Sequence, residues 1–320
     1  MTQSLSLIIA TYNRGPRIAP TLDSVINQTL MPDEIIVVDD GSMDSTGDWV
    51  RTNYPQVQVV KTPNGGTSRA RNSGAEHARG EVLMFLDHDD TLLPNAVETL
   101  LGLLTRFPEA CAAFADHVYT NLVTGVRYDN HHSAQPAFRR LSSIPVLRRC
   151  GNARVYGRAM HRALLHGNLL QQPWAIYRET FFKLNGFEPS IRYCEDWDLY
   201  LRVAMAAPLV LSDEVISNHI IEGENLHLVP GQEEMQKRVM LRQIRACLLA
   251  RPGAVVVLCR RLANYWKNAG DLASREKSMA KAWKLYLKSA AVWPCDHVVL
   301  ARLLMWGPRV LWEMIHQPVK

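Results

Sequence analysis

Short apolar runs alternate with helix-like segments over the first hundred residues, and this alternation constrains the fold more than any other feature of the chain. The apolar runs are rich in β-branched residues, typical of strands buried on both faces, and span residues 5–10, 34–38, 57–61 and 81–86. Segments of helical character follow these runs at residues 17–28, 44–54, 68–78 and 94–106. Because strands that alternate with helices are joined by right-handed crossovers, the pattern predicts an α/β fold with a mostly parallel central sheet.

Polar side chains follow three of the four predicted strands, at the points where the strands end. Thr11 and Tyr12 come after the first strand, Asp39 and Asp40 after the second, and an acidic segment at residues 87–90 after the fourth. In a parallel sheet the carboxyl ends of the strands meet at one edge, and ligands bind beyond that edge. The sequence therefore predicts that these groups line one binding site.

Three carboxylates, those of Asp87, Asp89 and Asp90, lie within four residues at the end of the fourth predicted strand. Carboxylates that share a site repel one another unless a cation is present, and hard oxygen ligands suit Mg²⁺ or Mn²⁺. An isolated acidic turn is more often a solvated loop than a metal site. The position of this turn beside two other polar clusters favours a divalent metal ion.

The other polar groups at this edge fit a nucleotide. An ionised Asp40 can accept a hydrogen bond from a base N–H, and Tyr12 can stack on the base. A solvated turn and an aromatic cover for the sheet edge are the alternative interpretations. The glycines at residues 65–66 precede a helical segment but lack the lysine of a P-loop, so we expect the metal and cations such as Arg71 to bind phosphate.

Several motifs of the chain follow one another in an order and at spacings typical of one protein family. They are Ile8-Ile9-Ala10-Thr11-Tyr12-Asn13-Arg14, Ile36-Val37-Val38-Asp39-Asp40-Gly41-Ser42, Ser68-Arg69-Ala70-Arg71-Asn72-Ser73-Gly74, Gly80-Glu81 with Leu86-Asp87-His88-Asp89-Asp90, and Gly186-Phe187 followed by Glu195-Asp196-Trp197-Asp198-Leu199. At these motifs the chain strongly resembles the family 2 glycosyltransferases, which have the GT-A fold. The resemblance covers residues 4 to 225.

The resemblance implies that a sugar moves from a nucleotide-sugar to an acceptor hydroxyl, with inversion at the anomeric carbon. The donor is expected to be UDP-linked, and the acceptor to be a saccharide or a lipid-linked molecule in cell-surface polysaccharide or glycolipid biosynthesis. The residues implied are Thr11, Tyr12, Asp40, Arg71 and Asp87 for the nucleotide, Asp89 and His219 for Mn²⁺ or Mg²⁺, and Asp196 as catalytic base with Glu195 beside it. The family's usual Tyr-Arg before this histidine is replaced by Ser217-Asn218.

The chemistry of a single inverting displacement agrees with the role that the resemblance implies for Asp196. The base must lie opposite the leaving group, so it should come from a different segment than the metal ligands. Asp198 lies two residues further along a predicted helix and therefore points away from Asp196. We expect Asp198 to bind the acceptor or to support the structure.

The C-terminal part of the chain differs from the rest in composition. Residues 1–232 are expected to form the catalytic domain and residues 233–320 a helical extension, which holds 16 Lys and Arg against 6 Asp and Glu. Within residues 277–290, Lys277, Lys281, Lys284 and Lys288 lie opposite an apolar face formed by Met279, Trp283, Tyr286, Leu287 and Ala290. This face indicates either packed helices or contact with an anionic membrane surface.

A second pattern in the extension favours a helical hairpin. Trp266, Gly270, Ala282, Tyr286 and Pro294 match the spacing of one tetratricopeptide-like hairpin, without a second repeat. The basic residues do not accompany a nucleic-acid-binding module, so no nucleic-acid partner is expected.

The sequence leaves two other functions open: a sugar-phosphate nucleotidyltransferase and a non-catalytic nucleotide-sugar-binding protein. The segment after the first strand lacks the glycine-rich basic loop of the former, and the presence of both Asp89 and Asp196 argues against the latter. The six cysteines are scattered and no apolar run approaches the ~20 residues that span a bilayer. A cytoplasmic location is expected, with peripheral association at the inner face of the membrane as an alternative.

Overall fold

The computed structural model describes residues 3–130, 141, 143–221, 232–247, 252–275 and 279–293, together with residues 296, 299 and 303. It divides into two compact units, Met1–Val229 and Pro230–Lys320. The division predicted from the sequence, between residues 232 and 233, lies three residues further along the chain. The two units are described separately below.

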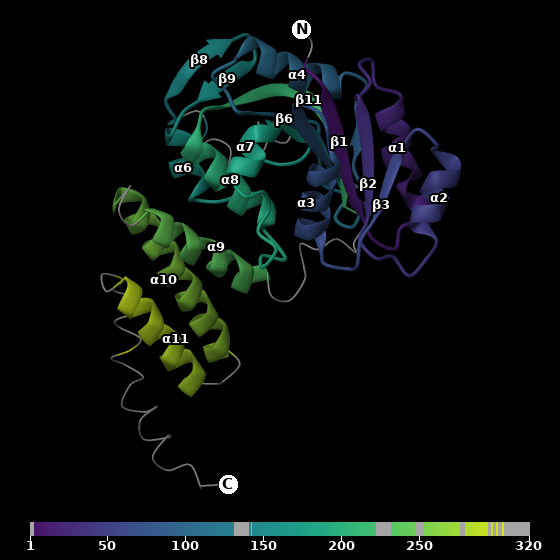
Figure 1. The fold of residues 1–320 in the computed structure, drawn as a ribbon. Helices are drawn as coiled ribbons and strands as arrows, with labels where there is room; N and C mark the ends of the chain where they lie inside the picture. The colour runs from purple at the N-terminus through teal and green to yellow at the C-terminus, as the bar shows by residue number, and fades with distance from the viewer. Residues whose placement is uncertain are drawn as a thin grey trace. The chain divides into compact units, whose positions relative to one another are not determined.

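One mixed β-sheet forms the centre of the first unit (Figure 1). Its strands are β1 (Leu5–Thr11), β2 (Glu34–Asp39), β3 (Gln58–Lys61), β4 (Val82–Asp87), β5 (Thr91–Leu92), β6 (Ala112–Asn121), β7 (Arg127–Tyr128), β8 (Val146–Cys150), β9 (Ala153–Tyr156), β10 (Trp174–Tyr177) and β11 (Leu209–Ile221). The strand order is β3-β2-β1-β4-β10-β6-β11-β9-β8, with β5 on β11 and β7 on β6. Strands β3, β2, β1 and β4 are parallel, as the alternating sequence pattern predicts.

The sheet continues beyond β4 through a strand of opposite direction. β10 is antiparallel to both β4 and β6, and β6 is parallel to β11. Between β6 and β10 the chain forms β7, β8, β9 and helix α6 (Ala159–Leu164). Tyr128 belongs to β7, and residues 131–140 lie outside the described part of the chain.

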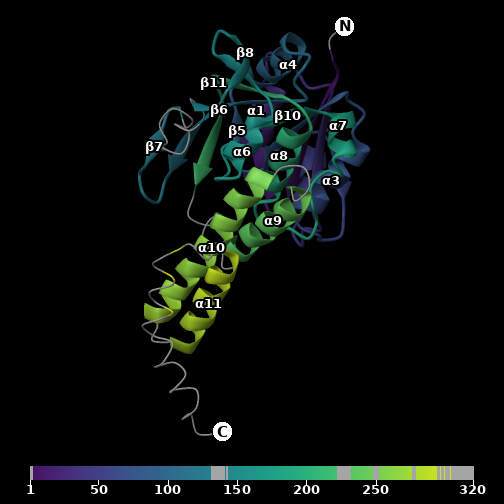
Figure 2. The ribbon, with the colours of Figure 1, turned by 90° about the vertical axis from the view of Figure 1, so that its left-hand side faces the viewer.

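Helices cover both faces of the sheet, as Figures 1 and 2 show. They are α1 (Ala19–Ile26), which follows a 3-10 turn at Gly15–Ile18, α2 (Thr46–Asn53), α3 (Thr67–His77), α4 (Ala96–Arg106), α7 (Arg178–Lys183) and α8 (Glu195–Ala206). Alternate residues of a strand point to opposite faces. Leu7 and Ile9 of β1 accordingly join the core formed with α1, α2 and α4, whereas Ile8 packs against Gly74 of α3 on the other face.

An aromatic cluster on the α3 face links the sheet to α8. The ring of Trp174 on β10 stacks on Phe114 with centroids 5.2 Å apart and on Phe85 at 5.6 Å. Tyr200 of α8 meets the rings of Trp174 and Phe114 edge-on, with centroids 5.1 Å apart in each pair. These buried rings make a large apolar contact that holds α8 against β4, β10 and β6.

The described part of the second unit consists of α9 (Gln232–Cys247), α10 (Pro252–Arg275) and α11 (Met279–Val292). Tyr286 of α11 packs where Gly270 of α10 leaves room: a Cβ at Gly270 would lie 2.7 Å from the ring. The Tyr286 hydroxyl donates a hydrogen bond to Asp271. This close approach agrees with the hairpin spacing found in the sequence, of which Pro294 lies outside the described residues.

The buried side of α11 differs from its predicted apolar face. Ala282, Tyr286 and Ser289 are fully buried, whereas Leu287 is 41% exposed. The Lys288 ammonium lies 4.7 Å from the centre of the Trp266 ring, and Lys277 is outside the described residues. Among the helices that the structure describes, none combines the length and apolar character needed to cross a bilayer.

We expect Gly74→Ala to lower the free energy of unfolding by about 1–3 kcal/mol, the usual cost of overpacking a core. A Cβ at this position would lie 2.4 Å from Cγ2 of Ile8 and 3.1 Å from Cγ2 of Val38, so α3 and β1 would have to separate. Gly102→Ala is the matched control, because its Cβ meets no atom within 4 Å and helix propensity favours alanine by ~1 kcal/mol. Urea denaturation measures both; equal stability of the two variants would contradict the packing argument.

Candidate active site

The structure brings the three polar segments at the strand ends to one edge of the sheet. Thr11 pairs with Asp39 across β1 and β2, and the backbone N–H of Asp40 donates to the Thr11 carbonyl at 2.9 Å. Asp87 pairs with Ala10 across β4 and β1. The predicted convergence at the carboxyl ends of the parallel strands is therefore present.

The carboxylate of Asp40 holds the start of α3. Its Oδ1 accepts the N–H of Gly65 and its Oδ2 accepts the N–H of Gly66, each at 2.8 Å. Each oxygen of an ionised carboxylate offers two lone pairs, so both can accept a further hydrogen bond. Tyr12 is 40% exposed, so part of its ring is accessible to a ligand.

Arg71 of α3 joins the two halves of the site. The residue is only 4% exposed; its Nη2 contacts Asp87 Oδ1 at 2.5 Å and its Nη1 contacts Glu195 Oε1 at 2.7 Å. Its carbon Cζ also lies 5.2 Å from the centre of the Phe187 ring. The strand-end aspartates and the segment at residues 195–196 therefore lie beside one another. With these nitrogens engaged, a direct contact of Arg71 with the nucleotide stays a prediction.

The buried arginine influences its two carboxylates differently. Burial would raise the pKa of Asp87, but attraction to Arg71 outweighs burial, and the pKa of Asp87 lies below its ordinary value. Burial dominates at Glu195 and raises its pKa to about 7 despite the contact with Arg71. Glu195 is therefore able to exchange a proton near neutral pH.

Asp196 lies in the first turn of α8, where the helix dipole favours negative charge. The preceding residue, Cys194, has a left-handed backbone with φ of 65°, an unusual conformation that often marks functional sites. Asp196 Oδ2 accepts a hydrogen bond from Asn168 Nδ2 at 2.8 Å, and Oδ1 accepts the N–H of Trp197. Burial raises the pKa of Asp196 above its ordinary value, against the opposing effect of the Trp197 N–H.

Asp198 has a structural position. Its side chain is fully buried, and its Oδ2 lies 2.8 Å from Nη2 of Arg202, one helical turn further along α8. Arg202 also donates to the carbonyl of Leu184. Of the two expectations for Asp198, support of the structure agrees with this geometry, because a fully buried carboxylate has no surface for an acceptor.

The two predicted metal ligands have different surroundings. The Asp89 side chain is partly exposed and lies 3.5 Å from Nη2 of Arg14. Nδ1 of His219, at the end of β11, lies 2.8 Å from Oδ1 of the buried Asp90, whose carboxylate raises the pKa of His219 against the effect of burial. Among the described residues, no group of three or more His, Cys, Asp or Glu side chains has the geometry to hold a metal ion.

Comparison with known proteins gives the family. Residues 6–165, which make up half of the chain, match the family model described as Glycosyl transferase family 2. The chain belongs to glycosyltransferase family 2. The resemblance found at the strand-end motifs is confirmed.

Two curated relatives of this family 2 glycosyltransferase are named as glycosyltransferases. YibD of Escherichia coli K12 is 40% identical over 105 residues, 32% of this chain and 30% of YibD. A glycosyltransferase of Rickettsia typhi is 26% identical over 217 residues, 66% of this chain and 62% of the relative. The chain therefore covers less than two thirds of the length of either relative.

Solved structures of S. aureus TarS share the fold of this glycosyltransferase. TarS residues 1–349 in complex with UDP-GlcNAc superpose with a TM-score of 0.63 at 17% identity, covering 96% of this chain and 88% of that chain. A complex of the same TarS segment with UDP gives a TM-score of 0.60 at 16% identity, with 99% and 93% covered. At this identity the likeness shows the fold, and it confirms the GT-A architecture expected from the sequence.

Sequence reasoning missed two polar residues that the structure places in the candidate site, and it gave a third, Arg14, no role. Asn168 holds Asp196, and Arg14 lies beside Asp89. In the orientation of its amide that satisfies both neighbours, Gln172 donates to Asp87 Oδ1 at 3.3 Å and accepts from Arg71 Nη2 at 2.6 Å. Only Arg14 belongs to a recognisable motif; Asn168 and Gln172 lie between α6 and β10 in a stretch without periodicity.

Arg71→Met is expected to lower the free energy of unfolding by about 3–5 kcal/mol at pH 7, because it leaves the largely buried carboxylate of Glu195 without its cation. Without Arg71, the pKa of Glu195 rises further, and a raised carboxyl pKa makes the folded state less stable as pH increases. The difference in the free energy of unfolding between the wild type and Arg71→Met, measured by urea denaturation, should therefore grow from pH 5 to pH 8. Arg69→Met, an exposed arginine of the same helix, is the control; a deficit that is constant with pH would contradict this assignment.

Proposed function

We propose that this family 2 glycosyltransferase transfers a sugar from a UDP-linked donor to a hydroxyl of a saccharide or lipid-linked acceptor, with inversion at the anomeric carbon. The observation that carries the proposal is the Arg71 bridge, because it sets Glu195 and Asp196 beside the aspartates at the end of β4. The choice of donor is supported by TarS, which has the same fold and binds UDP-GlcNAc.

The nucleotide would bind at the ends of β1, β2 and β4. Tyr12 offers a partly exposed ring for stacking on uracil, and Asp40 offers the remaining lone pairs of its carboxylate to a base N–H. The hydroxyl of Thr11 is buried without a hydrogen-bond partner among the described residues. A buried hydroxyl of this kind indicates a group that a ligand satisfies. Asp87 would face the ribose.

The residues at the end of β4 fit a divalent metal ion on the diphosphate. Asp89 offers carboxylate oxygens, and Mg²⁺ typically takes one or two carboxylates with the remaining ligands from water and phosphates. His219 has Nδ1 against the Asp90 carboxylate, the arrangement that orients the ring of a metal-binding histidine. Mn²⁺ or Mg²⁺ bound there would neutralise charge on the leaving diphosphate.

Asp196 would act as the base in a single displacement. Its ionised carboxylate would accept the proton of the acceptor hydroxyl while that oxygen bonds to the anomeric carbon of the donor. The bond from the anomeric carbon to the diphosphate oxygen breaks in the same step, and its electron pair leaves with UDP. Asn168 would keep the carboxylate of Asp196 oriented through the hydrogen bond to Oδ2. Arg71, which is buried beside these groups, would hold Glu195 next to the base.

The alternative functions differ in their products. A sugar-phosphate nucleotidyltransferase joins a nucleoside triphosphate to a sugar phosphate and releases pyrophosphate, and a binding protein releases nothing.

The proposal also includes a pathway and a location. The pathway is cell-surface polysaccharide or glycolipid synthesis, and the location is cytoplasmic, with contact of residues 277–290 with an anionic membrane. The exposed Lys281 and Lys284 support such a contact, whereas Lys288 is engaged with Trp266.

We expect Asp196→Asn to slow UDP release from UDP-GlcNAc by about 10²–10⁴-fold, the usual contribution of a general base, while the Kd for UDP stays within twofold. Water serves as acceptor in this assay. In the wild type, the rate should fall on the acid side with an apparent pKa above that of an ordinary aspartate, because only the ionised carboxylate accepts a proton. Asp129→Asn, an exposed carboxylate, is the control. Undiminished UDP release, or loss of UDP binding in a folded variant, would refute the assignment of Asp196 as the base.

Asp89→Ala is expected to remove the metal-dependent part of nucleotide binding. Calorimetric titration of the wild type with UDP should show tighter binding with Mn²⁺ than with EDTA, and the variant should bind weakly in both. Asp48→Ala on α2 removes an exposed carboxylate elsewhere and should behave as the wild type. Full-strength binding by the Asp89 variant that EDTA does not weaken would rule out this residue as a ligand.

A further inference from the structure

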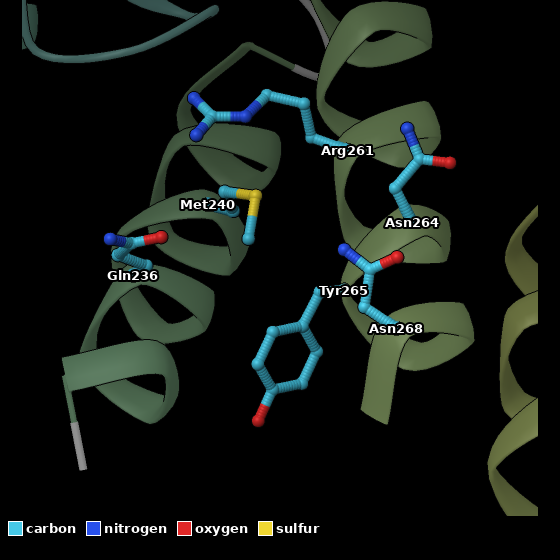
Figure 3. A pocket seen from close by; sticks show the side chains of 6 residues that line it. All are labelled: Gln236, Met240, Arg261, Asn264, Tyr265 and Asn268. Carbon is cyan, nitrogen blue, oxygen red and sulfur yellow. The ribbon is translucent and has the colours of Figure 1, made fainter. Parts of the chain in front are cut away.

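The second unit contains a pocket between α9 and α10 that the catalytic proposal does not use (Figure 3). Its volume is about 240 Å³, below the ~300–1,000 Å³ of sites for drug-sized ligands, so it suits one small ring. In Figure 3, the side chains of Arg261 and Tyr265 extend from α10 toward α9. The lining residues are Gln236, Met240, Arg261, Asn264, Tyr265 and Asn268.

The helical geometry explains how one pocket collects these side chains. Residues 261, 264, 265 and 268 of α10 are spaced by three, four and seven positions from the first, so they share one face of the helix. Gln236 and Met240 are four positions apart on α9 and likewise share a face. The pocket is therefore formed by regular helix faces and not by a loop.

The chemistry of the lining excludes several ligand classes. Met240 is the single aliphatic side chain among the six, so an apolar ligand would leave most of the polar groups without partners. None of the six carries a carboxylate, which excludes a metal cation held by hard anionic oxygens. What remains is a ligand with several hydrogen-bonding groups and one apolar face.

Three amides are available for such a ligand. Among the described residues, no hydrogen bond to another residue involves the side chain of Gln236, Asn264 or Asn268. Each amide has two N–H donors and a carbonyl acceptor, so it can donate to one hydroxyl oxygen and accept from a neighbouring hydroxyl. Tyr265 adds an aromatic face, and the Lys237 ammonium lies 5.9 Å from the centre of that ring.

We propose that this pocket binds one sugar residue of a saccharide. Sugars carry adjacent hydroxyls that match paired amide and guanidinium groups, and their C–H faces pack on aromatic rings. The inference rests on the proposed function, in which the acceptor is a glycan.

The test uses the full chain and the methyl glycosides of glucose, galactose, mannose, rhamnose, N-acetylglucosamine and glucuronic acid as probes. Saturation-transfer NMR should detect binding of at least one glycoside, and Asn264→Ala with Asn268→Ala should weaken it at least tenfold. Both asparagines are exposed helical positions where alanine favours the helix, so the double variant should fold. Asn53→Ala, an exposed helical asparagine of the first unit, is the matched control and should bind as the wild type.

The proposal is overturned if no glycoside binds, if the double variant binds as well as the wild type, or if inorganic phosphate displaces every bound glycoside. Loss of glycoside binding in Asp196→Asn, with retention in the double variant, would place the sugar in the active site and would also overturn it. The Kd for UDP is measured in the same samples. Absence of UDP binding in the wild type would contradict the proposed function. The glycoside result would still test the pocket independently.

Discussion

The contact on which the site depends is the Arg71 guanidinium between Asp87 and Glu195. One carboxylate comes from the end of β4 and the other from the start of α8, 108 residues later in the chain. Their charges would repel in a partly buried site without a cation between them. The arginine therefore makes it possible for two acidic segments to lie side by side. The two carboxylates nevertheless differ: attraction to Arg71 outweighs burial and lowers the pKa of Asp87, whereas burial outweighs Arg71 and raises the pKa of Glu195 to about 7.

Packing around the ion cluster of Arg71, Asp87 and Glu195 determines the positions of these residues. The rings of Phe85, Trp174 and Tyr200 connect β4, β10 and α8 in one buried cluster, so the first turn of α8 cannot move without disturbing the core. The left-handed residues Asn13 and Cys194 immediately adjoin Tyr12 and Glu195. Unusual backbone at both places is retained because the surrounding fold supports it.

The helical unit has a different character. Its hairpin is held by the fit of Tyr286 against Gly270, and Trp266 lies between two lysines, with Lys237 at 4.9 Å and Lys288 at 4.7 Å from its ring centre. Part of the lysine surplus thus stabilises the helices internally through cation–π contact. Positive charge in a sequence does not by itself indicate a partner, because the tertiary structure decides which ammonium groups remain exposed.

The sequence by itself determined the parallel half of the sheet and the convergence of Thr11, Asp40 and Asp87, because strand and helix periodicities are local and parallel strands end at one edge. The family resemblance implied the roles that are proposed for Asp89 and Asp196. Only the tertiary structure decided that β10 enters antiparallel beside β4, that Asn168 holds Asp196, and that Asn264 lines a pocket with Gln236. These contacts join residues that no periodic pattern relates, and a polar side chain in an irregular segment or on an exposed helix face carries no local signal of what it will touch.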